Sequence, residues 1–288
     1  MLIKPPVYGS MQVLMLSFMM LFPEKASSQH VVADYDFETP DRVLKLSHSL
    51  KEISGLASGP DGQLYAVQDE DGIIYQLDPE DGSILAKQRF EGSGDYEGIE
   101  RVGGTMFVLR SSGHLFAIDI GSGEGIKATR KSRLDLPSRC DAEALGSDTA
   151  VGTMWVACKN TDGTKGKKTR SLFEITFQKG KWETELVLSI DQSVLNEASG
   201  KKKWKVKDVR PSGLTIKNET VFVLSAVNDL LLILQPQRTD IIDLGRLGLQ
   251  QAEGIAIDTD GTLFIASEGV GSRAKVLVFK HNPTNSSN

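Results

Sequence analysis

The fold is decided by five short stretches of sequence that share one pattern. They are Glu52-Ile53-Ser54-Gly55-Leu56, Asp95-Tyr96-Glu97-Gly98-Ile99, Asp141-Ala142-Glu143-Ala144-Leu145, Arg210-Pro211-Ser212-Gly213-Leu214 and Gln251-Ala252-Glu253-Gly254-Ile255. Aligned on the small fourth residue, their third residues form a column of Ser54, Glu97, Glu143, Ser212 and Glu253. A strand-rich repeat of about 40–50 residues is typical of a β-propeller, a ring of four-stranded sheets called blades.

The composition agrees with one globular, turn-rich β domain. The chain has 288 residues, of which 40% are hydrophobic, 25% are charged and 28 are glycine. Its net charge of −5 lacks the basic balance that nucleic-acid binding requires, so we expect no nucleic-acid partner. Because a single blade cannot bury both of its faces, the repeats predict one closed ring rather than separate domains.

Within each repeat, Asp-Gly pairs separate short apolar runs, which is a strong signal for hairpins. The first repeat, for example, predicts strands over 53–57, 64–68, 73–77 and 84–90. The fifth repeat runs out of chain after three strands. The segment Arg42–Ser47 is placed to supply the missing outer strand, and we expect it to close the ring and remove an exposed edge.

The number of blades depends on one long interval. The column residues are separated by 43, 46, 69 and 41 residues. The interval of 69 exceeds its neighbours by too little to hold a further blade, so it is better explained by two insertions, Lys159–Arg170 and Asp191–Val209. The prediction is an all-β, five-bladed propeller, with six blades as the alternative.

The N-terminal segment has a different character from the rest. A basic residue, Lys4, precedes the twelve-residue apolar run Met11–Phe22, and small residues follow at 26–28. This is the layout of a secretory signal peptide, and a helix of that length, about 18 Å, is shorter than a membrane core. We therefore expect a signal peptide or an N-terminal anchor over 1–28, the propeller over 29–281 and a disordered tail over 282–288.

Export would place the two cysteines, Cys140 and Cys158, in an oxidising compartment. They flank the turn between the first two strands of the third repeat. They could therefore face each other across that hairpin as a disulfide, or remain as two buried thiols.

The column supplies the best clue to chemistry. In a propeller the starts of the innermost strands lie at one mouth of the central channel, which would gather Glu97, Glu143 and Glu253. Further acidic residues expected at this mouth are Asp69, Asp95, Asp141 and Glu268. Converging carboxylates repel one another unless a cation or a proton neutralises them. Hard oxygen ligands favour Ca²⁺, so we predict a calcium site there. The alternative is structural: each Glu could accept hydrogen bonds from the backbone of the neighbouring blade.

Two other features carry weaker signals. The basic cluster Lys201–Lys207, which includes Trp204, could contact an anionic membrane surface, or it could be a solvated loop. His114 could be a catalytic base or a solvated turn residue. The familiar motifs of a nucleophile elbow, a P-loop and a zinc protease are absent from the sequence.

Three motifs together resemble the SdiA-regulated (YjiK-type) family. They are Ser54-Gly55-Leu56-Ala57, Tyr96-Glu97-Gly98-Ile99-Glu100 and Gln251-Ala252-Glu253-Gly254-Ile255-Ala256, the last followed by Leu263-Phe264-Ile265-Ala266-Ser267-Glu268. The resemblance spans roughly residues 42 to 280. It implies a five-bladed propeller related to NHL-repeat proteins, with bound calcium, in an extracytoplasmic and membrane-associated bacterial protein. The long basic insertions and the paired cysteines depart from the family pattern.

Three functions follow from these observations. The first is an exported calcium-binding propeller that recognises a small molecule or a protein at the channel mouth. The second is a calcium-dependent hydrolase of the lactonase or esterase type, in which the metal would polarise a substrate oxygen. The third is a scaffold whose carboxylates only tie blades together.

Overall fold

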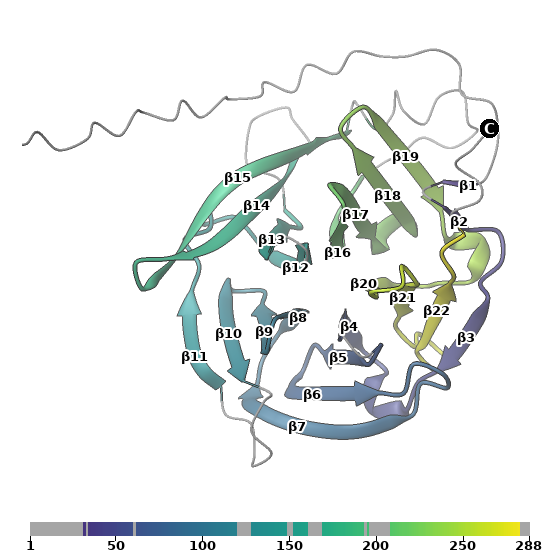
Figure 1. The fold of residues 1–288 in the computed structure, drawn as a ribbon, viewed down its shortest axis with the longest axis horizontal. Helices are drawn as coiled ribbons and strands as arrows, with labels where there is room; N and C mark the ends of the chain where they lie inside the picture. Colours follow the sequence, from purple (N-terminus) through teal and green to yellow (C-terminus); the bar gives the residue numbers. More distant parts are fainter. Residues whose placement is uncertain are drawn as a thin grey trace, which may run out of the picture.

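The computed structural model describes residues 31–32, 34–59, 62–119, 128–148, 152–160, 169–192, 195 and 208–282. In these ranges the protein is a ring of five antiparallel sheets with four strands each, a five-bladed β-propeller (Figure 1). This confirms the predicted fold class and the lower blade number. The N-terminal segment 1–28, the cluster Lys201–Lys207 and the tail beyond residue 282 lie outside the described residues.

Each blade contributes one strand to each of four concentric positions. The innermost strands are β4 (Ile53–Ser58), β8 (Tyr96–Val102), β12 (Ala142–Asp148), β16 (Pro211–Lys217) and β20 (Ala252–Ile257). The second strands are β5 (Leu64–Gln68), β9 (Thr105–Arg110), β13 (Thr153–Cys158), β17 (Thr220–Ser225) and β21 (Leu263–Ser267). The third strands are β6 (Asp71–Leu77), β10 (His114–Asp119), β14 (Thr169–Gln178), β18 (Leu230–Gln235) and β22 (Lys275–Phe279). The outermost strands are β7 (Ile84–Ser93), β11 (Ala128–Arg133), β15 (Lys181–Asp191), β19 (Arg238–Asp243) and β3 (Arg42–Lys45).

The remaining elements are short. They are the strands β1 (Val31–Val32) and β2 (Tyr35–Asp36) and the 3₁₀ turns η1 (His48–Leu50), η2 (Ala226–Asn228) and η3 (Gly245–Leu247). Within the described ranges, no helical segment has the length and apolar character that crossing a membrane would require.

The ring is closed by the N-terminal strand, as the sequence predicts. Strand β3 pairs with β22 in the last blade, with Leu44 opposite Val276 and Lys45 opposite Lys275. Leu44 and Leu46 are buried against the apolar residues of the first and fifth blades. Since β3 comes from the opposite end of the chain, this pairing fastens the first and last repeats together without leaving an open edge on β22.

The core consists of five hydrophobic clusters, and each spans two neighbouring blades. Between the second and third blades, for example, Leu109 and Leu115 pack with Val156 and Ile175. The other four clusters join the remaining neighbours in the same way. Each blade therefore buries its two faces only against the adjacent blades, which explains why the repeats form one cooperative ring.

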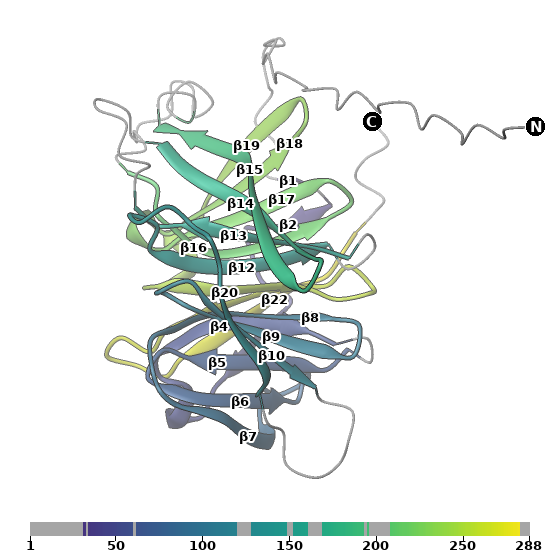
Figure 2. The same ribbon diagram turned by 90° about the vertical axis from the view of Figure 1, so that its left-hand side faces the viewer.

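The inner strands approach one another closely around the ring axis (Figure 1), and Figure 2 shows the same ring from the side. A Cβ atom on Gly98 would lie 2.8 Å from the backbone nitrogen of Leu145 in the next blade. A Cβ atom on Gly254 would lie 2.8 Å from the Cβ of Leu56. The small residue of the repeated pattern is therefore required by the distance between neighbouring inner strands.

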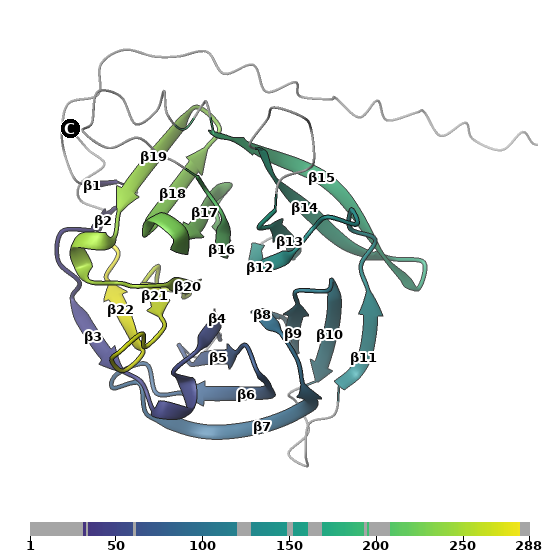
Figure 3. The ribbon, with the colours of Figure 1, turned by 180° about the vertical axis from the view of Figure 1, so that it is seen from behind.

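A short N-terminal hairpin, β1–β2, lies beside β19 and β22 (Figure 3). Tyr35 of β2 and Phe37, which follows the hairpin, pack against Phe222 and Phe279, and the Tyr35 hydroxyl donates a hydrogen bond of 2.6 Å to the carbonyl of Gly261. The sequence did not predict this hairpin, which covers the junction between the fourth and fifth blades.

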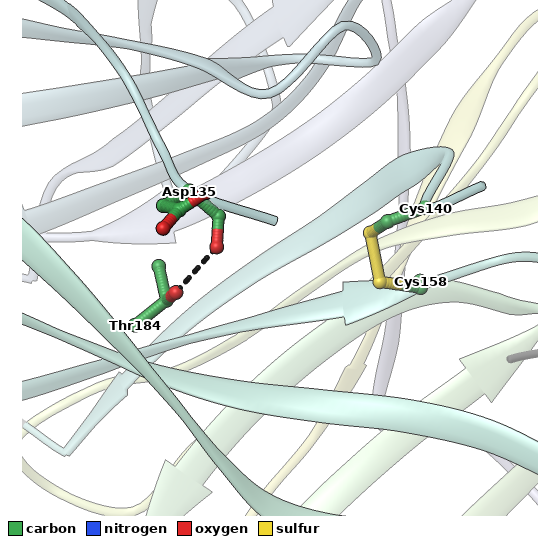
Figure 4. Close-up of a disulfide and its surroundings, with 4 residues drawn as sticks. All are labelled: Asp135, Cys140, Cys158 and Thr184. Atoms are coloured by element: carbon green, nitrogen blue, oxygen red, sulfur yellow. Dashed lines mark hydrogen bonds between the residues drawn. A yellow bond between two sulfur atoms is a disulfide. The ribbon is translucent and has the colours of Figure 1, made fainter. Parts of the chain in front are cut away.

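A disulfide and contacts with the second blade stabilise the third blade. Cys140 and Cys158 form a disulfide that joins the approach to β12 with the end of β13 (Figure 4). The long β14–β15 hairpin reaches back to the second blade, where the Thr184 hydroxyl donates a hydrogen bond of 2.6 Å to the carbonyl of Asp135. Trp182 of the same hairpin packs edge-on against Phe107, with ring centroids 5.7 Å apart.

Candidate functional site at the channel mouth

The repeated column coincides with a β-bulge in all five blades. In the second blade Tyr96 pairs with Arg110 and Gly98 pairs with Leu109, so Glu97 between them has no partner on β9. The same register shift occurs at Ser54, Glu143, Ser212 and Glu253. A bulge re-aims the side chain of its extra residue, so these five positions depart from the regular alternation of the inner strands.

The two serines of the column tie neighbouring blades together. The Ser54 hydroxyl donates a hydrogen bond of 2.6 Å to the carbonyl of Tyr96 in the second blade. The Ser212 hydroxyl donates one of 2.8 Å to the carbonyl of Ala252 in the fifth blade. Both serines are buried, and both reach the same repeat position of the following blade. The serines therefore join neighbouring blades by donating to backbone carbonyls, a role that the sequence analysis considers only for the glutamates, as acceptors.

The three glutamates of the column make different contacts. Among the described residues, none of them accepts a hydrogen bond from the backbone of the next blade. Glu97 and Glu253 line a space on the ring axis that inner-strand residues of all five blades surround. This space offers about 10 Å³, which is room for roughly one water molecule. Glu143 is buried and accepts a hydrogen bond of 2.8 Å from the Lys159 ammonium group.

Burial and mutual repulsion shift the pKa of all three glutamates upward. Burial, followed by the charge of Glu143 and by Asp95 and Glu253, raises the pKa of Glu97 to about 10. Burial, with Glu268 and Glu143, raises the pKa of Glu253 to about 8. Burial also raises the pKa of Glu143 to about 7, although Lys159 acts in the opposite direction. The charges of Glu143 and Glu253 therefore act on Glu97, and the charge of Glu143 acts on Glu253, across three blades.

Two of these glutamates pair with a second acidic side chain. The Glu97 carboxyl group lies within hydrogen-bonding reach of Asp95, and that of Glu253 within reach of Glu268. A hydrogen bond between two carboxyl groups requires a proton on one of them, so a proton or a cation at each pair would relieve the repulsion. The Glu268 carboxylate is oriented by the Gln251 amide, which donates a hydrogen bond of 2.8 Å to it.

The other predicted residues lie in the same electrostatic neighbourhood. Burial and the charges of Glu52 and Glu70 raise the pKa of Asp69, and its Oδ1 atom is buried without a hydrogen-bond partner among the described residues. The Asp141 carbonyl accepts a hydrogen bond of 2.8 Å from the Lys159 backbone. The side-chain charge of Asp141 acts on both Glu143 and Lys159. Each of the seven acidic residues that the sequence singled out therefore acts electrostatically on at least one of the others, although the described residues form no close group of three.

Lys159 supplies a positive charge at the mouth that the predicted calcium site does not take into account. Burial alone would lower its pKa, but the hydrogen bond and charge of Glu143, with Glu97 and Asp141, outweigh that effect and raise it. Arg110 lies nearby with its guanidinium 5.4 Å from the centre of the Tyr96 ring. Among the described residues, the carboxyl groups at the mouth still outnumber the basic groups.

The fit to a metal ion is incomplete in this arrangement. In the described part of the chain, no three or more His, Cys, Asp or Glu side chains are grouped closely enough to hold an ion. The carboxyl groups meet in pairs, and Glu143 already has an ammonium partner. The all-oxygen donor set suits Ca²⁺, but a bound ion would have to displace the shared protons and draw the pairs together. The metal-ligand assignment of Glu97, Glu143 and Glu253 stays a prediction.

Two titratable residues lie apart from this cluster. Glu100, which the sequence analysis missed as a site, is fully buried, and burial raises its pKa to about 8. It accepts a hydrogen bond of 2.8 Å from Ser147 in the third blade, so it links two inner strands. His114 hydrogen-bonds to Ser112, and its pKa is lowered by burial and by the charges of Lys131, Arg133 and Arg110.

The fold has known structural relatives. Glutaminyl cyclase of Myxococcus xanthus is 16% identical with a TM-score of 0.56, and the match covers 84% of this chain and 95% of that one. The PQQ-bound aldose sugar dehydrogenase of Streptomyces coelicolor is 13% identical with a TM-score of 0.56, covering 84% and 97%. At these identities the likeness concerns the fold alone. No curated protein matches the sequence.

The sequence itself identifies the family. The model of the family described as SdiA-regulated matches residues 27–270, which include all five column positions and all five inner strands. With the predicted motifs and the five-bladed ring, this match over most of the chain establishes that the protein belongs to the SdiA-regulated family.

Proposed function

We propose that the protein is an exported calcium-binding propeller that recognises a small molecule or a protein partner at its channel mouth. The observation that carries the ion-binding part is the pairing of Glu97 with Asp95 and of Glu253 with Glu268 beside one axial space. Export is supported by the signal-like N-terminal sequence and by the disulfide, which is stable in oxidising compartments.

The two carboxyl pairs would hold the ion, with Glu143 as a third ligand. Placing two carboxyl groups within hydrogen-bonding reach is costly unless a proton or a cation lies between them. A divalent cation would supply more neutralising charge than one proton, so it should bind with release of the protons. Glu143 would join only if Lys159 turned away from it.

The small size of the axial space favours a binding module over an enzyme with its active site in the channel. A space of about 10 Å³ admits an ion or a water molecule but no organic substrate. A ligand or partner must therefore contact the surface of the mouth rather than enter the channel. No observation on the described residues favours the hydrolase alternative: His114 hydrogen-bonds to Ser112, and burial and neighbouring basic residues lower its pKa.

Calcium titration of the purified protein tests the proposal. After removal of divalent ions, we expect CaCl₂ to raise the melting temperature and to give a saturable heat of binding, because an ion that binds only the folded state stabilises it. Affinity should weaken as the pH falls from 8 to 6, because protons then compete for Glu97 and Glu253.

A matched pair of variants makes the test specific to the mouth. Glu97→Gln should abolish or strongly weaken binding, whereas Glu100→Gln should retain it. Both residues are glutamates of β8, with Glu97 partly buried and Glu100 buried, but Glu100 contacts Ser147 and lies outside the acidic pairs. An unchanged melting temperature at millimolar CaCl₂ in the native chain, or equal binding by both variants, would remove the support for a mouth site.

A further inference from the structure

A second feature of the mouth lies off the axis, between the third and fourth blades. It is a cavity of about 830 Å³, within the size range of small-molecule sites. Its lining includes Arg139 and Asp141 from the approach to β12, Arg170 from the start of β14, and Asp208 and Arg210 from the approach to β16. The axial space is far too small for an organic ligand, so this is the larger of the two spaces at this end of the ring.

The arginines of the cavity are held in place by one carboxylate. Arg170 Nη2 lies 2.7 Å from Asp208 Oδ1, and Arg210 Nε lies 3.0 Å from Asp208 Oδ2. The backbone carbonyl of Asp208 in turn accepts a hydrogen bond from the Asn228 side chain. The Arg170 side chain is only 5% exposed, whereas that of Arg210 is 48% exposed. Asp208 therefore orients a buried and a solvent-facing guanidinium group together.

The charges of the cavity differ from those of the acidic mouth beside it. Among its described lining residues there are three guanidinium groups and two carboxylates, and Asp208 is already engaged by two of the arginines. Arg139 is exposed at the rim, next to the disulfide-bonded Cys140. Guanidinium groups recognise carboxylates and phosphates through paired, charge-assisted hydrogen bonds, and a pre-oriented group loses less entropy on binding.

We propose that this cavity binds a small molecule carrying a carboxylate or phosphate group. Arg139 and Arg210 contact the anionic group, and Arg170 is a positioning residue that acts through Asp208. Asp141 also lines the cavity and belongs to the acidic mouth. A second anionic group on the ligand would therefore be repelled on that side of the cavity. The site does not depend on a cation at the axis and would remain if none bound there.

The test uses protein freed of divalent ions and two anions, inorganic phosphate and succinate, at constant ionic strength. We expect at least one of them to raise the melting temperature and to bind with a measurable Kd; the stronger of the two identifies the preferred group. Removing one charged hydrogen-bond donor should weaken binding about tenfold or more in R139Q and in R210Q. Both residues are exposed, so these variants should fold.

R246Q is the matched control. Arg246 is also exposed and also paired with a carboxylate, Glu38, but it lies in η3, outside the cavity. It should bind the anions as the native chain does. The proposal is overturned if neither anion binds the native chain, or if R139Q and R210Q keep its Kd, or if R246Q loses affinity equally. Because no calcium is present, these outcomes are independent of the ion-binding test.

Discussion

Replacing Glu97 with Gln should stabilise the ion-free protein, and the gain should grow with pH. In the folded protein, burial and neighbouring acidic groups raise the pKa of Glu97 from 4.5 to about 10. The folded state therefore holds the proton more tightly than the unfolded state. Such a group contributes its full stability below the unfolded pKa, and that contribution falls as the pH rises from about 4.5 towards 10.

The size of the effect follows from the shift. Each pH unit between the two pKa values costs about 1.4 kcal/mol, so at pH 7.5 the native chain loses up to about 4 kcal/mol relative to pH 4.5. Partial solvent exposure and relaxation reduce this, and we expect about 2–4 kcal/mol. The amide of the Glu97→Gln variant would not ionise, so the variant would not lose this stability as the pH rises.

Urea denaturation at pH 5, 6.5 and 8, in the absence of divalent ions, measures this difference. The variant should match the native chain within about 1 kcal/mol at pH 5 and exceed it clearly at pH 8. Glu80→Gln is the control, since the Glu80 side chain is 78% exposed and its ion pair with Arg42 should contribute little at any pH. A difference between Glu97→Gln and the native chain that stays constant from pH 5 to pH 8 would refute the electrostatic account of the mouth.

Three further perturbations test the packing that positions the site. Replacing both Cys140 and Cys158 with Ser should lower the free energy of unfolding by about 3 kcal/mol, the loop-closure value for a separation of 18 residues, and the loss should be absent when both proteins are compared under reducing conditions. Gly98→Ala should destabilise the protein by about 1–3 kcal/mol in urea denaturation, because the new Cβ would meet the Leu145 backbone at 2.8 Å; a neutral result would mean that the inner strands can separate. Ser212→Ala should cost about 1–3 kcal/mol by leaving the buried carbonyl of Ala252 without its donor, whereas a loss below about 0.5 kcal/mol would contradict its role as a clasp between blades.

Much of the fold could be predicted from the sequence because the repeat is encoded in local chemistry. Asp-Gly turns mark the hairpins, and the small residue of each repeat is dictated by the narrow distance between inner strands. The closing strand at Arg42–Lys45 was predictable because the last repeat was one strand short. The β1–β2 hairpin was not, since two-residue strands carry no pattern of their own.

The site was predicted in its location but not in its contacts. The column aligned Ser54 and Ser212 with three glutamates, yet the short hydroxyls bind the next blade while the glutamates do not. The spacing of the repeats could not predict that Glu143 pairs with Lys159 or that Glu253 pairs with Glu268. These partners directly follow the second strands, β13 and β21, outside the repeated motif. The arginine-lined cavity depends on Asp208, which pairs with the nearby Arg210 and with Arg170, a residue distant in sequence. No local sequence pattern predicts this cavity.

Proton release on calcium binding tests the central claim most directly. Calorimetric titrations with CaCl₂ at pH 7, in buffers with different heats of ionisation, measure how many protons leave as the ion binds. If the ion replaces the protons shared by Glu97 with Asp95 and by Glu253 with Glu268, binding should release protons, and Glu97→Gln should reduce both the release and the affinity. Calcium binding without proton release, or the absence of binding, would contradict the account.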